Sequence, residues 1–144
     1  MIVNTAYIYM GSGGGGGGEP ANPNLWQNGV SNYPVEFTNN SSIKPNYLTL
    51  TSSGSATFSE LLLTGFNSLT ISRYGNDFLP NIPIKIEFFN SSGQLLGTET
   101  VTFAYSTKTQ SVNIPSAAKI QNAKIRMTNE NSSRNINLSS AVLS

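Results

Sequence analysis

NIPIKIEFFNSSGQLLGTETVTF, residues 81–103, is the stretch that decides the fold. Its first half places an apolar side chain at every second position, at Ile82, Ile84, Ile86 and Phe88. Such alternation is typical of a strand with one buried face. The segment NSSGQ at 90–94 is rich in turn-forming residues, and strand-forming residues resume after it. Residues 84–103 are therefore predicted to form a β-hairpin.

Short runs of the same character occupy the chain from Leu25 onward, separated by Gly, Pro, Asn and Ser. We expect strands at 34–38, 47–51, 55–65, 68–74, 82–90, 95–105, 110–115, 123–129 and 135–143. Short strands that recur about every 8–12 residues predict a β-sandwich or barrel. The expected fold class is all-β, a single antiparallel β-sandwich of jelly-roll type. Residues 116–125 are expected to form one turn or a loop that tucks Ala117, Ala118 and Ile120 against the domain.

The N-terminal part of the chain is predicted to contain two segments that precede the sandwich. IVNTAYIYM at 2–10 is strand-forming, and it is followed by a run of six glycines, Gly13, Gly14, Gly15, Gly16, Gly17 and Gly18. We expect residues 1–10 to be an anchoring strand, 11–24 a glycine-rich linker and 25–144 the sandwich. An isolated strand needs a neighbour. The residues proposed to bind a partner protein are Ile2, Val3, Tyr7, Ile8 and Tyr9. In the alternative, this strand completes the domain's own sheet.

Composition excludes several classes of function. The net charge is +1 and the eight Lys and Arg residues are scattered, so we expect no nucleic-acid partner. No apolar run approaches the ~20 residues of a membrane span. Cys and His are absent, which removes thiolate and imidazole catalysis and zinc sites of the Cys/His kind. We expect no cofactor.

The acidic residues do not suggest a catalytic or metal site. Glu87 and Glu99 fall on the two arms of the hairpin and could face each other as a pair of carboxylates. No other residue supports that pair, so the protein is predicted not to be an enzyme. Asn76 and Asp77 lie in a turn-like segment, but a single carboxylate is a poor calcium site, and we expect no metal.

Aromatic residues in polar contexts are the strongest binding signal. Sugars are bound by an aromatic surface with a few placed amides and hydroxyls, which needs little charge. The candidate glycan-binding residues are Trp26, Tyr33, Tyr47, Tyr74, Asn76 and Asp77. The competing interpretation is that each aromatic residue fills the core or caps a strand.

Two segments carry a resemblance to known proteins. LTISRYGNDFLPNIPIKIEFFNSSGQLLGTETVTF at 69–103 and NAKIRMTNENSSRNINLSSAVLS at 122–144 resemble jelly-roll carbohydrate-binding modules and related β-sandwiches of bacteriophage virion proteins. The front end, MIVNTAYIYMGSGGGGGG followed by NPNLW, is similar to small phage structural proteins that begin with an anchoring peptide. The resemblance implies that the N-terminal segment docks on the capsid, neck or tail while the sandwich projects outward. The usual calcium and sugar ligands of the modules are not matched residue by residue.

The expected function is therefore that of a non-enzymatic virion structural protein, of capsid-decoration or tail type. It would bind other virion proteins through residues 1–10, present the sandwich to host cell-wall glycans and occur as a homo-oligomer or in many copies. The expected location is the virion, since the N-terminus lacks the pattern of a signal peptide. The alternatives are a free carbohydrate-binding module, and a tail or baseplate component with only a structural role.

Overall fold

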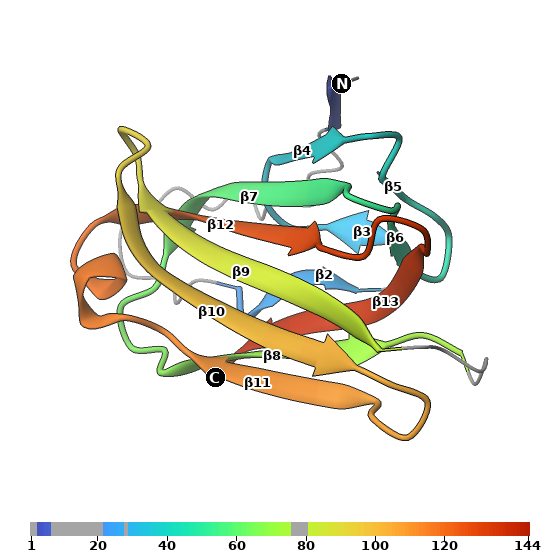
Figure 1. The fold of residues 1–144 in the computed structure, drawn as a ribbon. Coiled ribbons are helices and arrows are strands. Elements are labelled where there is room, and N and C mark those ends of the chain that lie inside the picture. Colours follow the sequence, from blue (N-terminus) through green and yellow to red (C-terminus); the bar gives the residue numbers. More distant parts are fainter. Residues whose placement is uncertain (1–2, 7–21, 28, 76–80) are drawn as a thin grey trace.

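The protein folds as an antiparallel β-sandwich (Figure 1). The computed structural model describes residues 3–6, 22–27, 29–75 and 81–144. Within these ranges there are 13 strands and one short 3₁₀ helix, η1 (Ser116–Lys119). All strand pairs are antiparallel, and the predicted all-β sandwich is confirmed.

The first sheet has six strands. Its spatial order is β1 (Val3–Ala6), β4 (Val35–Thr38), β7 (Ser55–Leu62), β12 (Asn122–Asn129), β9 (Ile82–Asn90) and β10 (Leu95–Phe103). Strands distant in sequence are thus neighbours, as β12 between β7 and β9 demonstrates.

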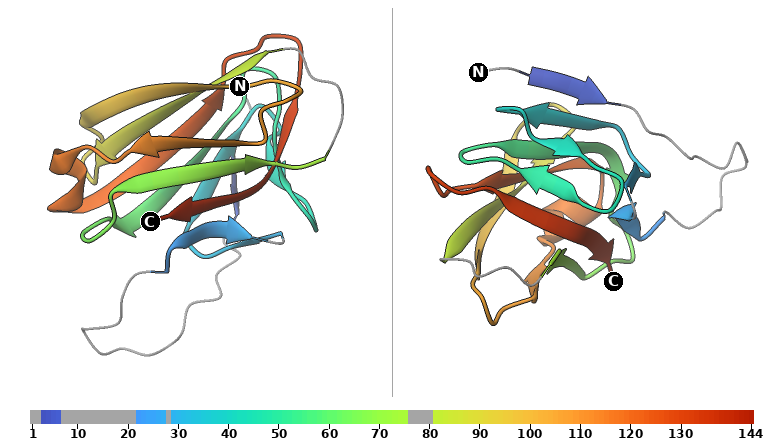
Figure 2. Two further views of the ribbon diagram at one scale, coloured as in Figure 1. Left: turned by 90° about the horizontal axis from the view of Figure 1, so that it is seen from below. Right: turned by 90° about the vertical axis from the view of Figure 1, so that its right-hand side faces the viewer.

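The second sheet has seven strands and packs on the first (Figure 2). Five follow in the order β11 (Thr109–Asn113), β8 (Ser68–Arg73), β13 (Ile136–Leu143), β2 (Asn24–Gln27) and β3 (Val30–Ser31). The last two, β5 (Ser42–Ile43) and β6 (Leu48–Leu50), form a small hairpin that joins the sheet where β6 pairs with β13. The short strands β2, β3 and β5 were not expected from the sequence, whereas the other strands of the sandwich were.

The core lies between the two sheets and follows the alternation seen in the sequence. Ile82, Ile84, Ile86 and Phe88 of β9 are all fully buried. Burying apolar surface of this kind stabilises the fold by roughly 25 cal/mol per Å². The buried faces of the strands therefore hold the two sheets together. Beyond the sheets, Ala118 of η1 is buried as expected, but Ala117 is exposed and Ile120 is 83% exposed. Only the middle of the expected apolar loop therefore packs on the domain.

The β9–β10 hairpin is confirmed, with Ile82 paired with Phe103 and Glu87 with Thr98. Glu99 pairs with Ile86, so Glu99 shares a face with Ile86, and Glu87 lies on the other face of the sheet. The expectation that Glu87 and Glu99 could face each other is wrong, because the register of the hairpin places them one residue out of step.

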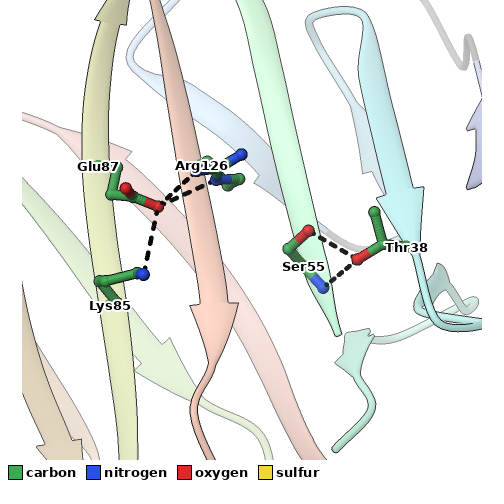
Figure 3. A network of polar contacts seen from close by, with 5 residues as sticks. All are labelled: Thr38, Ser55, Lys85, Glu87 and Arg126. Carbon is green, nitrogen blue, oxygen red and sulfur yellow. Dashed lines mark hydrogen bonds and ion pairs between the residues drawn. The ribbon is translucent and has the colours of Figure 1, made fainter. Parts of the chain in front are cut away.

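Glu87 instead belongs to an ion-pair network on the outer face of the first sheet (Figure 3). The guanidinium of Arg126 donates to Glu87 Oε1 from Nε at 3.0 Å and from Nη2 at 2.9 Å. The same oxygen lies 3.8 Å from Lys85 Nζ. Arg126 also lies over the ring of Phe89, 4.8 Å from its centroid. This face is therefore charged and cross-linked between β9 and β12.

The first described segment, β1, lies at the edge of the first sheet. It pairs with β4 from Val3 opposite Thr38 to Ala6 opposite Val35. Thr38 also bridges inward to the next strand, because its Oγ1 accepts from Ser55 N at 3.0 Å (Figure 3). The N-terminal strand thus continues the domain's own sheet. The expected linker, including Gly13–Gly18, lies outside the described residues.

Candidate functional site

Two of the tyrosines singled out from the sequence meet in space. The ring centroids of Tyr47 and Tyr74 are 4.8 Å apart and the rings are tilted by 32°. Tyr74 is 41% exposed and Tyr47 is half-buried. A pair of aromatic rings with one face open to solvent can receive the apolar face of a flat ligand.

Strand β13 brings these two tyrosines together. Leu138 of β13 is aligned with Leu48 of β6 on one side and with Arg73 of β8 on the other. Tyr47 directly precedes Leu48 and Tyr74 directly follows Arg73. Because neighbouring residues of a strand point to opposite faces, burial of Leu48 and Arg73 directs both tyrosines to the outer face of the second sheet.

Polar groups on β13 and its neighbours support the pair. Thr49 Oγ1 donates to Asn137 Oδ1 at 2.8 Å, which fixes the Asn137 carboxamide on the outer face beside the tyrosines. Tyr74 N donates to Asn137 O at 2.9 Å. On the far side, Lys108 Nζ donates to Gly75 O at 3.0 Å. The backbone beneath the tyrosine pair is thereby held from both sides.

Most side chains on the rest of this outer face carry hydroxyl groups. Thr70 Oγ1 and Ser111 Oγ are 2.7 Å apart across β8 and β11, and Ser68 Oγ lies 2.7 Å from Ser144 Oγ. The outward positions of β8, β11 and β13 are all uncharged, and comprise Ser68, Thr70, Ser72, Thr109, Ser111, Asn113, Asn137, Ser139, Ser140 and Val142. We call this surface, together with Tyr47 and Tyr74, the hydroxyl face.

The hydroxyl face has the chemistry of a binding surface for neutral polar ligands. Hydroxyls and carboxamides both donate and accept hydrogen bonds, so they match a ligand rich in hydroxyls. Within the described part of the chain, no group of three His, Cys, Asp or Glu side chains could hold a metal ion. In the same residues no helix is long and apolar enough to span a membrane.

Two other predicted glycan-binding aromatics are used differently. Trp26 is fully buried, stacks on Phe58 and directs Nε1 at Leu138 O, 3.4 Å away. The prediction that Trp26 contacts glycans is therefore wrong, because the ring fills the core between the two sheets. Tyr33 is partly buried against the core, and its hydroxyl donates to Asn22 O at 2.7 Å. Its role is to fasten the segment before β2.

Several predicted site residues lie outside the part of the chain that the structure describes. Asn76 and Asp77 lie outside the described residues, directly after the segment that carries Tyr74. Of the predicted partner-binding residues, Ile2, Tyr7, Ile8 and Tyr9 also lie outside them, and Val3 pairs with Thr38 in the sheet.

Neither the Ser and Thr residues of the hydroxyl face nor Tyr105 was predicted from the sequence as part of a site. Tyr105 is 53% exposed on the loop after β10, and Arg73 Nη2 donates to its carbonyl oxygen at 3.0 Å. The strand expected at 95–105 ends instead at Phe103, which leaves Tyr105 in a loop that contacts Arg73 at the end of β8. The alternation of Ser and Thr with buried residues in SLTISR could have predicted the row of hydroxyls on β8.

Comparison with known proteins supplies the fold but no family. No protein family and no curated protein matches the sequence. Among solved structures, 14 chains match. A CBM4 structure is 14% identical, each chain is covered to 83%, and the TM-score is 0.51. The fold is a jelly roll like that of carbohydrate-binding modules.

Two further matches come from different kinds of protein. A family 6 carbohydrate-binding module is 18% identical over 68% of this chain and 72% of its own, with a TM-score of 0.45. The enzymatically active domain of bacteriophage CBA120 tailspike protein 4 is 11% identical over 76% of this chain and 18% of its own, with a TM-score of 0.46. The predicted resemblance to carbohydrate-binding modules is confirmed for the fold, while the phage-virion assignment stays a prediction.

Proposed function

We propose that the protein is a non-catalytic glycan-binding module that holds a neutral polysaccharide on its hydroxyl face. The observation that carries this proposal is the Tyr47–Tyr74 pair, of which Tyr74 is 41% exposed, at one end of an uncharged surface rich in hydroxyls. A sugar ring stacks its C–H face on the tyrosines, and its hydroxyls exchange hydrogen bonds with Asn137 and the Ser/Thr rows.

The charge of the face decides the ligand class. An acidic polysaccharide needs several cationic partners, whereas the outward positions of β8, β11 and β13 are uncharged and Lys108, beside Tyr74, donates to Gly75 O. A neutral glycan avoids the desolvation penalty of a charge. A face that runs across three neighbouring strands suits an extended chain of sugars rather than a single enclosed sugar. The carbohydrate-binding-module-like fold supports the same assignment.

The test is binding of the full chain to neutral polysaccharides of different linkage, by affinity electrophoresis and calorimetry. We expect Tyr74→Ala and Tyr47→Ala each to weaken binding roughly tenfold, which corresponds to about 1.4 kcal/mol. Ile120→Ala is the control, since Ile120 is 83% exposed directly after η1 and is not part of the hydroxyl face. Binding that survives both tyrosine substitutions would remove the hydroxyl face as the site.

A virion location is a separate proposal. It rests on the N-terminal segment, whose strand-forming residues precede a glycine run. The pairing of β1 with β4 favours the alternative in which this strand completes the domain's own sheet. The two ideas are separated by the truncations described in the Discussion.

A further inference from the structure

The outer face of the first sheet carries a polar hollow, on the opposite side of the sandwich from the hydroxyl face. It has a volume of about 270 Å³ and is lined by Ser59, Glu60, Ser91, Asn122, Ala123 and Lys124. The lining comes from β7, from β12 and from the turn between β9 and β10. We call this hollow the Glu60 pocket.

A β-bulge aims Glu60 at the pocket. Phe58 pairs with Ile125 and Leu61 with Ala123, so Ser59 and Glu60 together lie opposite the single residue Lys124. The extra residue takes up a left-handed backbone, with φ of 60° at Glu60. Bulges re-aim a side chain that regular pleating would direct elsewhere.

Glu60 differs in its location from the other described non-glycine residues with positive φ. The other described non-glycine residues with positive φ are Asn39, Asn40 and Ser53, which lie in turns. Glu60 alone of these four lies inside a strand. Asn and Ser tolerate this conformation, whereas a glutamate there is strained, and such strain is kept mainly where a side chain is needed.

The opposite wall of the pocket is rigid. Asn90 Oδ1 accepts from Ser92 N at 3.1 Å, from Ser92 Oγ at 2.8 Å and from Gln94 N at 2.8 Å. These bonds fix the turn that carries Ser91. Asn90 is itself buried and pairs with Ala123 of the pocket floor. The pocket is thus shaped before any ligand arrives, which lowers the cost of binding.

The lining matches a small neutral molecule with several hydroxyls. Glu60 accepts hydrogen bonds, Lys124 donates them, and the two charges balance; Ser59, Ser91 and Asn122 do both. An apolar side chain lies beside this polar lining, since Leu62 pairs with Asn122 and is 55% exposed. Polar edges with an apolar face are the properties of a sugar ring.

We propose that the Glu60 pocket binds a single monosaccharide unit, such as the end of a glycan chain, independently of the hydroxyl face. The volume lies just below the range of about 300–1,000 Å³ typical of drug-sized ligands, which fits one ring rather than an oligosaccharide. A zwitterionic amino acid is the competing ligand, because its positive and negative groups match the charges of Glu60 and Lys124 in the pocket. The exposed Leu62 beside Asn122 favours the sugar, because it can contact the apolar face of the ring.

The test is titration of the isotope-labelled full chain with methyl glycosides of glucose, galactose and N-acetylglucosamine, followed by backbone NMR. We expect saturable shifts at residues 59–60, 91 and 122–124 for at least one sugar, and none from glycine or alanine. Glu60→Gln and Lys124→Met should each weaken binding about tenfold. Glu36→Gln and Lys85→Met, on the same sheet but outside the pocket lining, should leave binding unchanged.

Glu60→Gly separates a binding role from a structural one. It removes both the carboxylate and the left-handed strain, so we expect a higher melting temperature together with loss of sugar binding. Unchanged sugar affinity in Glu60→Gly, shifts caused by amino acids alone, or no shifts with any of the three sugars would each overturn the proposal. Because Tyr74→Ala leaves this pocket intact, failure here and failure of the hydroxyl face are distinguishable.

Discussion

Trp26 and Phe58 stack across the sandwich, with ring centroids 5.3 Å apart and planes inclined by only 14°. Trp26 comes from β2 of the second sheet and Phe58 from β7 of the first. Both are fully buried, and the indole N–H points to Leu138 O. The pair therefore couples the two sheets directly, through a strand that is only four residues long.

Truncating the indole should destabilise the whole domain. We expect Trp26→Ala to lower the free energy of unfolding by about 3–5 kcal/mol, since a large buried side chain leaves a cavity. Trp26→Phe keeps an aromatic ring and should cost less. Tyr74→Ala, at the exposed tyrosine, is the comparison and should stay within about 1 kcal/mol. Denaturant titration followed by circular dichroism measures all three; a Trp26→Ala loss no larger than that of Tyr74→Ala contradicts the core role.

Two glycines with the same backbone preference should respond differently to a methyl group. Gly29 and Gly65 have φ of 77° and 89°, where a side chain costs about 1–2 kcal/mol. A Cβ at Gly29 would also lie 2.6 Å from the carbonyl oxygens of Lys44 and Pro45, whereas a Cβ at Gly65 meets nothing within 4 Å. Gly29→Ala should therefore lower the melting temperature clearly more than Gly65→Ala. Equal shifts in thermal unfolding would mean that the contact at Gly29 relaxes without cost.

The alternation in the sequence was sufficient for the long strands β9, β12 and β13, because every second residue along most of their length is buried. Ile82–Asn90 shows this most clearly, as both ends of β9 agree with the expectation. The short strands β3 and β5 were not predicted because they have two residues each, too few to show an alternation of apolar and polar residues. Their existence depends on pairing with β2 and β6, which is a property of the tertiary structure.

The candidate site was predictable only in part. Polar surroundings singled out Tyr47 and Tyr74, whose rings meet, but NLWQNG gave Trp26 similar surroundings although its ring is buried. Local composition cannot distinguish the two cases, since burial depends on which face the opposing sheet covers. The meeting of Tyr47 with Tyr74 follows from their common neighbour β13, which is far from both in the sequence. The bulge at Glu60 follows from a strand register that no local pattern encodes.

A buried amide holds the corner between β12 and β13. Asn129 is fully buried; its Nδ2 donates to Leu50 O at 3.1 Å and to Arg134 O at 2.8 Å, and its Oδ1 accepts from Asn131 N at 2.9 Å. Asn129→Ala should lower the free energy of unfolding by about 1–3 kcal/mol, because buried backbone groups lose their partners. Asn113→Ala, on the exposed side of β11, is the control and should have little effect. Equal stability of the two variants in denaturant titration would show that water replaces the amide.

The N-terminal strand gives the sharpest test of how the chain is used. β1 covers the edge of β4, so removing residues 1–10 exposes a row of unpaired backbone groups. If β1 serves the domain's own sheet, this truncation should lower the melting temperature and promote self-association, measured by calorimetry and analytical ultracentrifugation. If residues 1–10 instead anchor the protein to a virion, the melting temperature should stay nearly unchanged. In that case, full-length protein should co-sediment with phage particles stripped of it, and a version lacking residues 1–18 should not. The pairing with β4 leads us to expect the loss of stability. A truncated chain that melts like the full one would return residues 1–10 to the role of an anchor, with the six glycines as its tether.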